Sequence, residues 1–203
     1  MGRKHRILVA SVIASVLGGF TCELIRPHEP EYHGRRLTSW LAYDAAHLPS
    51  LDAMATQAEQ DRVEDAVRHI GPDAIPVLMK LLRARDGVFN QQLVSLSLRY
   101  PFIPLHPRSA AECNAMAILG FKILGSIAKP AVPALTKLLD DSEGDGAVLA
   151  SMALARIGPC AQASVPALVR NLRDRNALVR CTATNALRQI SREAALNAGV
   201  GRV

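Results

Sequence analysis

The stretch IGPCAQASVPALVRNL, residues Ile157 to Leu172, decides the fold because the chain contains it in three related forms. The second form is LGSIAKPAVPALTKLL, from Leu124 to Leu139, and the shortest is IGPDAIPVLMKLL, from Ile70 to Leu82. Each form places a glycine near its start and a proline a few residues later, followed by a leucine-rich segment. A phrase that recurs in this way indicates a structural repeat.

The repeat has a constant period over most of its length. The interval from Gly125 to Gly158 is the same as the interval from Pro133 to Pro166, and we call it the repeat interval. A further step of this length from Gly158 reaches Ser191, where ATNALRQI stands before the serine as ASMALARI stands before the glycine. The phase therefore holds over three units.

Each unit has the pattern of two helices joined at the glycine. Apolar residues recur at helical spacing before the glycine, which itself suits a helix C-terminus, where a left-handed residue is common. Proline suits the first turn of the next helix, because it lacks only an N–H that would have no partner there. Leucines at i and i+4 then give the second helix an apolar stripe. The patterned residues are Ala117, Phe121 and Leu124, Ala150, Leu154 and Ile157, and Ala183, Leu187 and Ile190 before the turn, and Leu78 and Leu82, Leu135 and Leu139, and Leu168 and Leu172 after it.

Stacking is the way in which such hairpins bury their apolar stripes, since one hairpin alone leaves its stripe exposed. The composition agrees: aromatic residues make up only 4% of the 203 residues, and the strong helix formers Ala and Leu carry the apolar content. We therefore predict an all-α fold, an α-solenoid of stacked helical hairpins with an N-terminal hydrophobic helix.

The segment from Asp174 to Ile190 resembles the HEAT-like repeat, of the type found in bilin lyases. That family has an Asp or Asn, then Val-Arg, then Ala, Ala-Leu and a final Ile-Gly, and Ser191 departs from its last position. The resemblance covers about residues 58–191. It implies a solenoid of a family whose members mostly act as protein-binding scaffolds, while a minority are bilin lyases or DNA repair glycosylases. The matching residues are Asn176, Val179, Arg180, Ala183, Ala186, Leu187 and Ile190.

The repeats divide the chain into units 58–86, 109–143, 144–176 and 177–203, the last of which is expected to have only its first helix. Gly71 and Gly125 are further apart than the repeat interval, which indicates an insertion between the first two units, at residues 87–108. It contains a predicted short helix near 90–98 and then a proline-containing loop. This insertion could act as a spacer between units or as a contact for a partner, and both interpretations are open.

Residues 27–57 are expected to form a linker and a capping helix. The linker is expected to be extended, and Thr38 is a suitable N-cap for the helix that follows. The segment EYHGRRLTSWL, which begins at Glu31, resembles one that precedes the repeats in small exported bacterial HEAT proteins. We expect Trp40 and Leu41 to dock on the first repeat and cap the solenoid.

Residues 1–26 are typical of an export signal or a short membrane anchor. The basic start GRKHR precedes an uncharged apolar run that extends from Ile7 to Phe20. A secretory core has about 7–15 apolar residues and a membrane span about 20, so both a cleaved signal and an uncleaved anchor are open, with membrane association through residues 7–22 in the second case. Lipidation at Cys22 is a weaker alternative. We expect a protein on the periplasmic side of a bacterial cell envelope.

No arrangement of residues predicts a cofactor, a metal site or a catalytic centre. The segment from His28 to His33 lacks the i, i+4 histidine spacing of zinc proteases, and a proline interrupts it. The chain has no nucleophile elbow, phosphate-binding loop or dinucleotide fingerprint. Cys113 and Cys181 lie in helical apolar patterns, where a free cysteine is usually buried, and any disulfide pairing is open.

One row of cations recurs with the repeat. Lys80, Lys137 and Arg170 each stand four residues after the helix-starting proline, and Arg83 and Arg173 lie near them. The family resemblance implies that the second helix of each unit lines the concave surface, so this row is the candidate partner-binding site. A solvated helix face is the alternative interpretation.

The predicted function is a non-enzymatic scaffold or adaptor that binds another macromolecule, most simply a protein, through the concave face. An enzyme of the bilin-lyase or DNA glycosylase kind is an alternative that only the resemblance supports. A nucleic-acid-binding solenoid is another. Residues 145–203 contain 8 basic and 3 acidic side chains, but residues 27–144 contain 12 basic and 14 acidic ones, which disfavours a continuous basic groove. No small-molecule substrate is expected.

Overall fold

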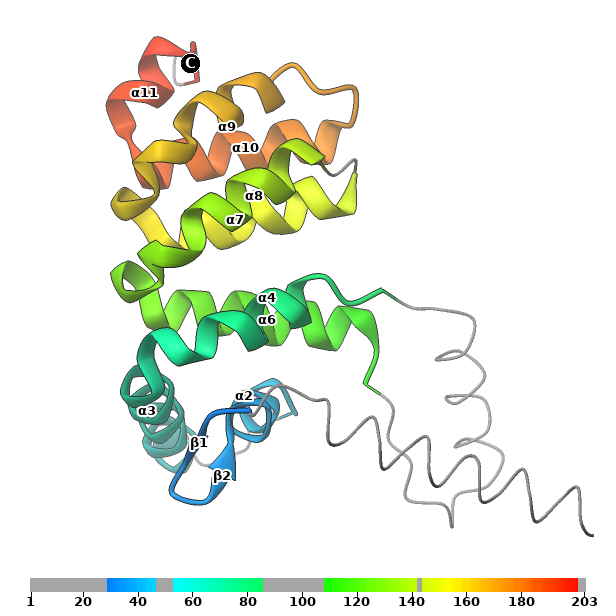
Figure 1. The fold of residues 1–203 in the computed structure, drawn as a ribbon. Helices are drawn as coiled ribbons and strands as arrows, with labels where there is room; N and C mark the ends of the chain where they lie inside the picture. The colour runs from blue at the N-terminus through cyan, green and yellow to red at the C-terminus, as the bar shows by residue number, and fades with distance from the viewer. Residues whose placement is uncertain (1–28, 47–52, 86–107, 142–143, 201–203) are drawn as a thin grey trace, which may run out of the picture.

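The computed structural model describes residues 29–46, 53–85, 108–141 and 144–200, and these form a stack of helices (Figure 1). The prediction of an all-α fold of stacked helical hairpins is confirmed. The N-terminal apolar segment and the predicted helix near 90–98 lie outside the described residues. The elements are β1 (Glu31–Tyr32), β2 (Arg35–Arg36), α2 (Leu37–Ala46), α3 (Ala53–Ile70), α4 (Ile75–Leu82), α6 (Ala110–Leu124), α7 (Val132–Asp141), α8 (Asp145–Ile157), α9 (Val165–Asn171), α10 (Ala177–Ile190) and α11 (Arg192–Asn197).

A glycine ends the first helix of three units, as the sequence predicts. Gly71, Gly125 and Gly158 have φ angles of 61°, 50° and 72°, which L-residues with a side chain rarely adopt. The second helix does not begin directly after the glycine, however. A 3-10 segment of four to seven residues turns each corner, at 71–74, 125–131 and 158–164. Prolines then lie in the first turn of α4, α7 and α9, also as predicted.

Small residues fill the contacts among α6, α8 and α10, and larger ones face them from the second helices. Ala117, Ala150 and Ala183 recur at the repeat interval and are fully buried. The second helices supply leucines instead, also fully or almost fully buried: Leu78, Leu82, Leu135, Leu139 and Leu168. Accordingly α8 packs closely along both α6 and α10, whereas α7 and α9 touch each other only at a few positions.

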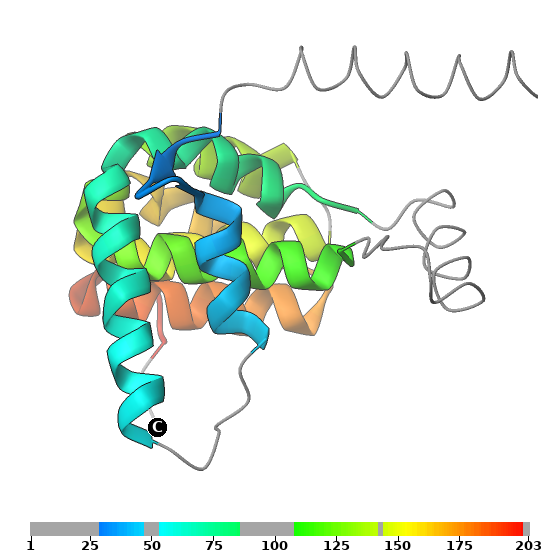
Figure 2. The same cartoon turned by 90° about the horizontal axis from the view of Figure 1, so that it is seen from below.

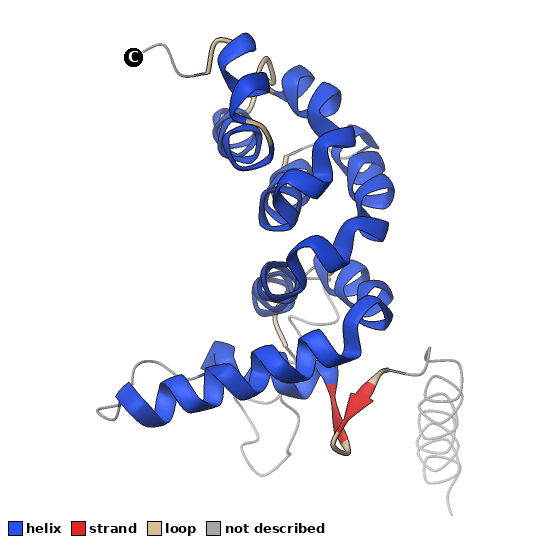
Figure 3. Ribbon diagram, turned by 90° about the vertical axis from the view of Figure 1, so that its left-hand side faces the viewer, coloured by secondary structure: helices blue, strands red, loops and turns tan. Residues whose placement is uncertain are grey.

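This difference in packing bends the stack into a crescent. In Figure 1 the helices α4, α7 and α9 lie in front of α6, α8 and α10. In the side view of Figure 3 that front layer becomes the bulging right-hand side, and the rear layer lines the hollow between α3 and the C-terminal end. We call α6, α8 and α10 the inner helices and α4, α7 and α9 the outer helices. The expectation that the second helices line the concave surface is therefore wrong.

The segment before the repeats is not an extended linker but a hairpin followed by a helix. β1 and β2 pair antiparallel around His33 and Gly34, whose positive φ angles of 50° and 69° are those of a tight primed turn. Helix α2 begins at Leu37, before Thr38, so Thr38 is not its N-cap. The backbone N–H of Thr38 instead donates to the carboxylate of Glu29 at 2.6 Å, which satisfies one free donor of the first turn.

The hairpin and α2 close the N-terminal end of the stack. Leu37 and Leu41 are fully buried, and α2 packs against α3 and α6. The Trp40 indole N–H donates to the carbonyl of Tyr32 at 3.2 Å, and the guanidinium of Arg35 lies 4.5 Å from the centre of the Trp40 ring. Figure 2 views this end, where α3 runs past the edge of the repeats beside α2.

The last unit differs from the prediction, because a second helix follows its first. After α10 the chain forms the short helix α11, which packs on α10. Ser191 takes the place of the repeat glycine with an extended backbone, φ −153°, and its hydroxyl accepts a hydrogen bond from the N–H of Ala194 at 3.2 Å. The departure from glycine thus has a local reason: no left-handed conformation is needed here, and a serine caps the next helix.

Two helical stretches, 110–140 and 145–171, are long and apolar enough by length and composition alone to cross a membrane. Each of them includes a corner glycine and the two helices on either side of it. About half of the most apolar window of each stretch is buried inside the fold, 50% and 44%. Core packing therefore accounts for their apolar character.

Gly120 is a position where added volume should destabilise the fold. A Cβ there would clash with Cδ2 of Leu78, and Leu78 is fully buried. We expect Gly120→Ala to lower the free energy of unfolding by about 1–2 kcal/mol, because overpacking exceeds the gain in helix propensity. Thermal and urea unfolding of Gly120→Ala, Leu78→Val and the double variant would measure it. The double variant should lose less than the sum of the single losses, and strict additivity would contradict the close contact.

Gly158→Ala should destabilise for a different reason. A Cβ at Gly158 meets nothing within 4 Å, but the φ of 72° is unfavourable for alanine, and we expect a loss of about 1–3 kcal/mol. The same unfolding measurements apply. Leu78→Val serves as the control, since shrinking that side chain should offset the loss at Gly120 and leave the loss at Gly158 unchanged.

Candidate functional site

The cations that the sequence singles out lie on the outer helices. Lys80 on α4, Lys137 on α7 and Arg170 on α9 are all exposed. They therefore occupy the bulging side of the crescent, not the concave side on which the prediction placed them. The physical reason is the small-residue packing of α6, α8 and α10, which brings those helices to the inside of the bend.

One member of this outer row is already paired. A guanidinium N–H of Arg170 donates to a carboxylate oxygen of Asp140 at 2.7 Å, which links α9 to α7. Arg83 and Arg173 are exposed one turn beyond Lys80 and Arg170, where the middle unit has Asp140. The outer row thus combines cations with a carboxylate, as a solvated helix face commonly does, and the exposed pair contributes at most about 1 kcal/mol.

A different surface repeats on the inner helices. On α8, the residues that keep exposure after packing against α6, α7 and α10 are Asp145, Leu149, Met152, Ala155 and Arg156. Their spacing of i, i+4, i+7, i+10 and i+11 is one helical stripe. Since the neighbouring helices cover the other sides of α8, this stripe faces the hollow of the crescent.

Equivalent stripes lie on both neighbours of α8. On α6 the stripe contains Glu112, Ala115, Leu119 and Lys122, and on α10 it contains Leu178, Cys181, Asn185 and Arg188. Met152 is 37% exposed and Leu178 is 52% exposed, while Leu119 and Leu149 are partly covered. We call these three stripes together the inner face. Its middle is mainly apolar.

Each stripe of the inner face ends in a cation. Lys122, Arg156 and Arg188 lie in the last turns of α6, α8 and α10 and are exposed. Cations at this place are favourable beside the negative end of a helix dipole. The sequence does contain the signal for this row, since a basic residue stands two or three positions before Gly125, Gly158 and Ser191. Our sequence reasoning missed it by taking the second helices as the inner ones.

The residues that carry the family resemblance have structural roles. Asn176 caps α10, since its side-chain oxygen accepts from the N–H of Leu178 at 2.9 Å. Arg180 donates to the carbonyls of Asp174 and Arg175 at 2.8 and 2.9 Å. These contacts fix the loop between α9 and α10, so they orient the inner helix without occupying the inner face.

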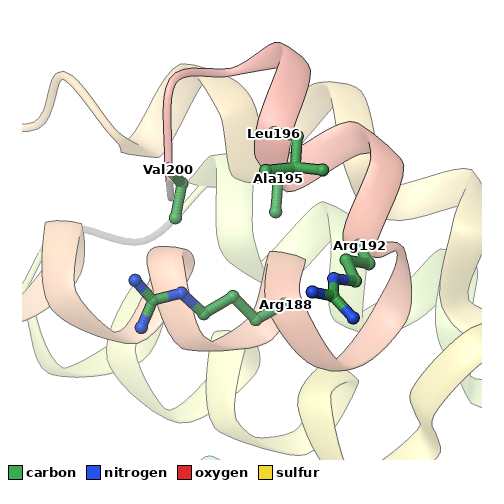
Figure 4. A pocket seen from close by; sticks show the side chains of 5 residues that line it. All are labelled: Arg188, Arg192, Ala195, Leu196 and Val200. Carbon is green, nitrogen blue, oxygen red and sulfur yellow. The ribbon is translucent and has the colours of Figure 1, made fainter. Parts of the chain in front are cut away.

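A shallow pocket of about 310 Å³ opens between α10 and α11 (Figure 4). Ala195, Leu196 and Val200 supply apolar walls, and Arg188 and Arg192 add two cationic side chains. In Figure 4 the Arg188 side chain extends beneath Val200, and the Arg192 guanidinium lies below Ala195 and Leu196, level with Arg188. The pocket therefore joins the end of the inner cation row to an apolar wall.

The described residues contain no group of three or more His, Cys, Asp or Glu side chains placed to hold a metal ion. Cys113 and Cys160 are half-buried and Cys181 is exposed, and all three carry thiols rather than disulfides. The expectation of a buried Cys181 is wrong, because its position on α10 faces the hollow. The described part of the chain thus offers a surface for contact and a pocket.

Comparison with known proteins supports the repeat assignment. Residues 132–198, which include α7 to α11, match the family model of HEAT repeats. No curated protein matches the chain, and no solved structure does. HEAT repeats generally mediate protein–protein interaction. With the helix–glycine–helix units described above, this match shows that residues 132–198 of the chain form HEAT-like repeats.

Proposed function

We propose that the protein is a non-enzymatic scaffold that binds another protein on its inner face. The observation that carries the proposal is the exposed apolar stripe of α8, in which Met152 is 37% exposed although the helix is packed on its other sides. Related stripes on α6 and α10 extend it to three helices. A contiguous apolar surface on a folded protein favours a macromolecular contact.

The chain offers a matched pair of residues for testing which face binds. Met152 on α8 and Val169 on α9 are both apolar and both 37% exposed, but they lie on the inner and outer sides. A photo-crosslinking amino acid at position 152 should capture a partner in the native cells, and the same amino acid at position 169 should not. The captured protein is then purified for a direct binding measurement.

Met152→Glu should weaken the reconstituted complex by about tenfold or more, because it places a charge in an apolar contact. Val169→Glu introduces the same charge on the other face and should leave the dissociation constant unchanged. Both positions are exposed, so the unfolding midpoint should change little in either variant. Equal weakening by both variants, or capture only from position 169, would overturn the assignment of the inner face.

We also propose that the protein works on the periplasmic side of a cell envelope. The support is the basic start and the apolar run Ile7 to Phe20, which lie outside the described residues. Cell fractionation of the tagged full-length chain should find it in the envelope, and Edman or mass-spectrometric analysis of its N-terminus shows whether residues 1–26 are removed. Recovery of the intact chain in the cytosol would refute the proposal.

A further inference from the structure

The charged and apolar side chains of the inner face are arranged in an order that restricts what can bind there. The inference drawn from this order rests on the scaffold function proposed above. Along the stripes of α6 and α8 the chemistry changes in the same direction, and the stripe of α10 shares only the cation at its end. Glu112 and Asp145 stand at the N-terminal ends of α6 and α8, apolar side chains stand in the middle, and cations stand at the C-terminal ends. Since the three helices are roughly parallel neighbours, these positions form bands that cross the stack.

The apolar band runs across the helices beside the cation band. Leu119 and Met152 are equivalent positions, separated by the repeat interval, and Lys122 and Arg156 follow them closely on the same stripes. On α10 the polar Asn185 stands at the position equivalent to Met152, and the exposed Leu178 stands at the position equivalent to Asp145. A ligand that lies across the three helices therefore meets apolar side chains on α6 and α8 and, beside them, a cation on each of the three helices.

The cation band is available for pairing. Within the described residues, ion pairs join Arg36 to Glu31, Arg68 to Glu64 and Arg170 to Asp140. None of them involves Lys122, Arg156 or Arg188. The contrast with the outer helices is direct, since there the Asp140 carboxylate already occupies Arg170.

The pocket between α10 and α11 extends this arrangement at the C-terminal end. Arg188 belongs both to the cation band and to the pocket lining, and Arg192 adds a second guanidinium. Leu196, 50% exposed, and Val200 form the apolar wall. An apolar side chain next to a carboxylate suits this pocket better than either group alone.

We propose that the partner presents an amphipathic helix with an acidic flank, which lies across α6, α8 and α10. Its apolar side covers Leu119 and Met152, and its acidic flank meets Lys122, Arg156 and Arg188. Three helices packed about 8–10 Å apart span roughly 20 Å, which a helix of about 14 residues covers. This is the helix-in-groove mode of recognition, with apolar anchors at i, i+3, i+4 and i+7.

Two observations favour a protein segment over a nucleic acid. The band beside the cations is aliphatic and contains no aromatic side chain on which a base could stack. Glu112 and Asp145 lie on the same stripes, and their carboxylates would repel a phosphate backbone that covered the whole face. A partner helix that is acidic along one flank matches a face with cations at the C-terminal ends of its stripes and carboxylates at the N-terminal ends of α6 and α8.

The test is a selection from a displayed library of random peptides of about 16 residues, long enough to cross the face as a helix. The target is the full-length protein, purified in a mild detergent that keeps the apolar run at its N-terminus in solution. The enriched peptides should carry Glu and Asp on one helical flank and apolar residues at i, i+3, i+4 and i+7. Synthetic versions are then measured by fluorescence anisotropy.

The inner triple variant Lys122→Glu/Arg156→Glu/Arg188→Glu should weaken these peptides by about tenfold or more. The outer triple variant Lys80→Glu/Lys137→Glu/Arg173→Glu changes the net charge equally and should bind as the wild type does. Circular dichroism melting checks that both remain folded. If charge reversal unfolds the inner variant, Lys122→Gln/Arg156→Gln/Arg188→Gln removes the charges with less repulsion and should still weaken binding several-fold.

Other outcomes separate the two proposals. Enriched peptides that are basic or uncharged, or that bind the inner triple variant equally well, overturn the acidic helix. If Met152→Glu still abolishes their binding, the scaffold function stands. Failure to enrich any peptide, together with salt-sensitive binding of a mixed single-stranded oligonucleotide that the inner triple variant loses, overturns both in favour of a nucleic acid partner.

Discussion

Each helical hairpin in this chain leaves one apolar side uncovered, and the neighbouring hairpin is what covers it. Every other feature of the fold follows from that dependence. The buried leucines of α4, α7 and α9 and the buried alanines of α6, α8 and α10 form one continuous core, so no unit can be removed without exposing its neighbours. The end of the stack needs a different solution, and the hairpin with α2 supplies it through Leu37 and Leu41.

The helices and corners were predictable because they depend on local chemistry. Glycine at a positive φ and proline in a first turn have the same physical reason in any chain. The N-terminal hairpin was missed because its signal is the two-residue turn at His33 and Gly34, and only the glycine is typical of such a turn. The Glu29 contact with Thr38 was not accessible, since it joins residues nine positions apart through a turn that had first to be recognised.

The inner face was assigned to the wrong helices for a reason of packing. Both helices of a unit are amphipathic, so periodicity alone does not tell which one lies inside the bend. The size of the buried residues does carry that information. Positions 120, 153 and 186 are Gly, Ala and Ala at the repeat interval, and such small residues let the inner helices approach one another. The sequence correctly predicted that the outer cations recur with the repeat. It did not show that Asp140, which stands among them, pairs with Arg170, so that this arginine is not a free charge.

The cationic side chains of the described residues fall into two groups, those that make contacts within the fold and those that do not. Arg180 holds a loop through backbone carbonyls, Arg170 joins two outer helices, and Arg35 lies on the Trp40 ring. Lys122, Arg156 and Arg188 have no such structural contact among the described residues. A binding surface is therefore better identified by charges that the fold does not use than by charge alone.

Because each unit contacts mainly its neighbours, the chain has a simple route to a longer form. Duplication of one repeat block between α9 and α10 would add one inner helix and one outer helix, whose contacts with the helices on either side would repeat those now made between neighbouring units. The inner face would grow by one stripe, and the bend of the crescent would continue through it. The hairpin and α2 cover the N-terminal end, so an added unit would have to stack inside the array rather than beyond α2.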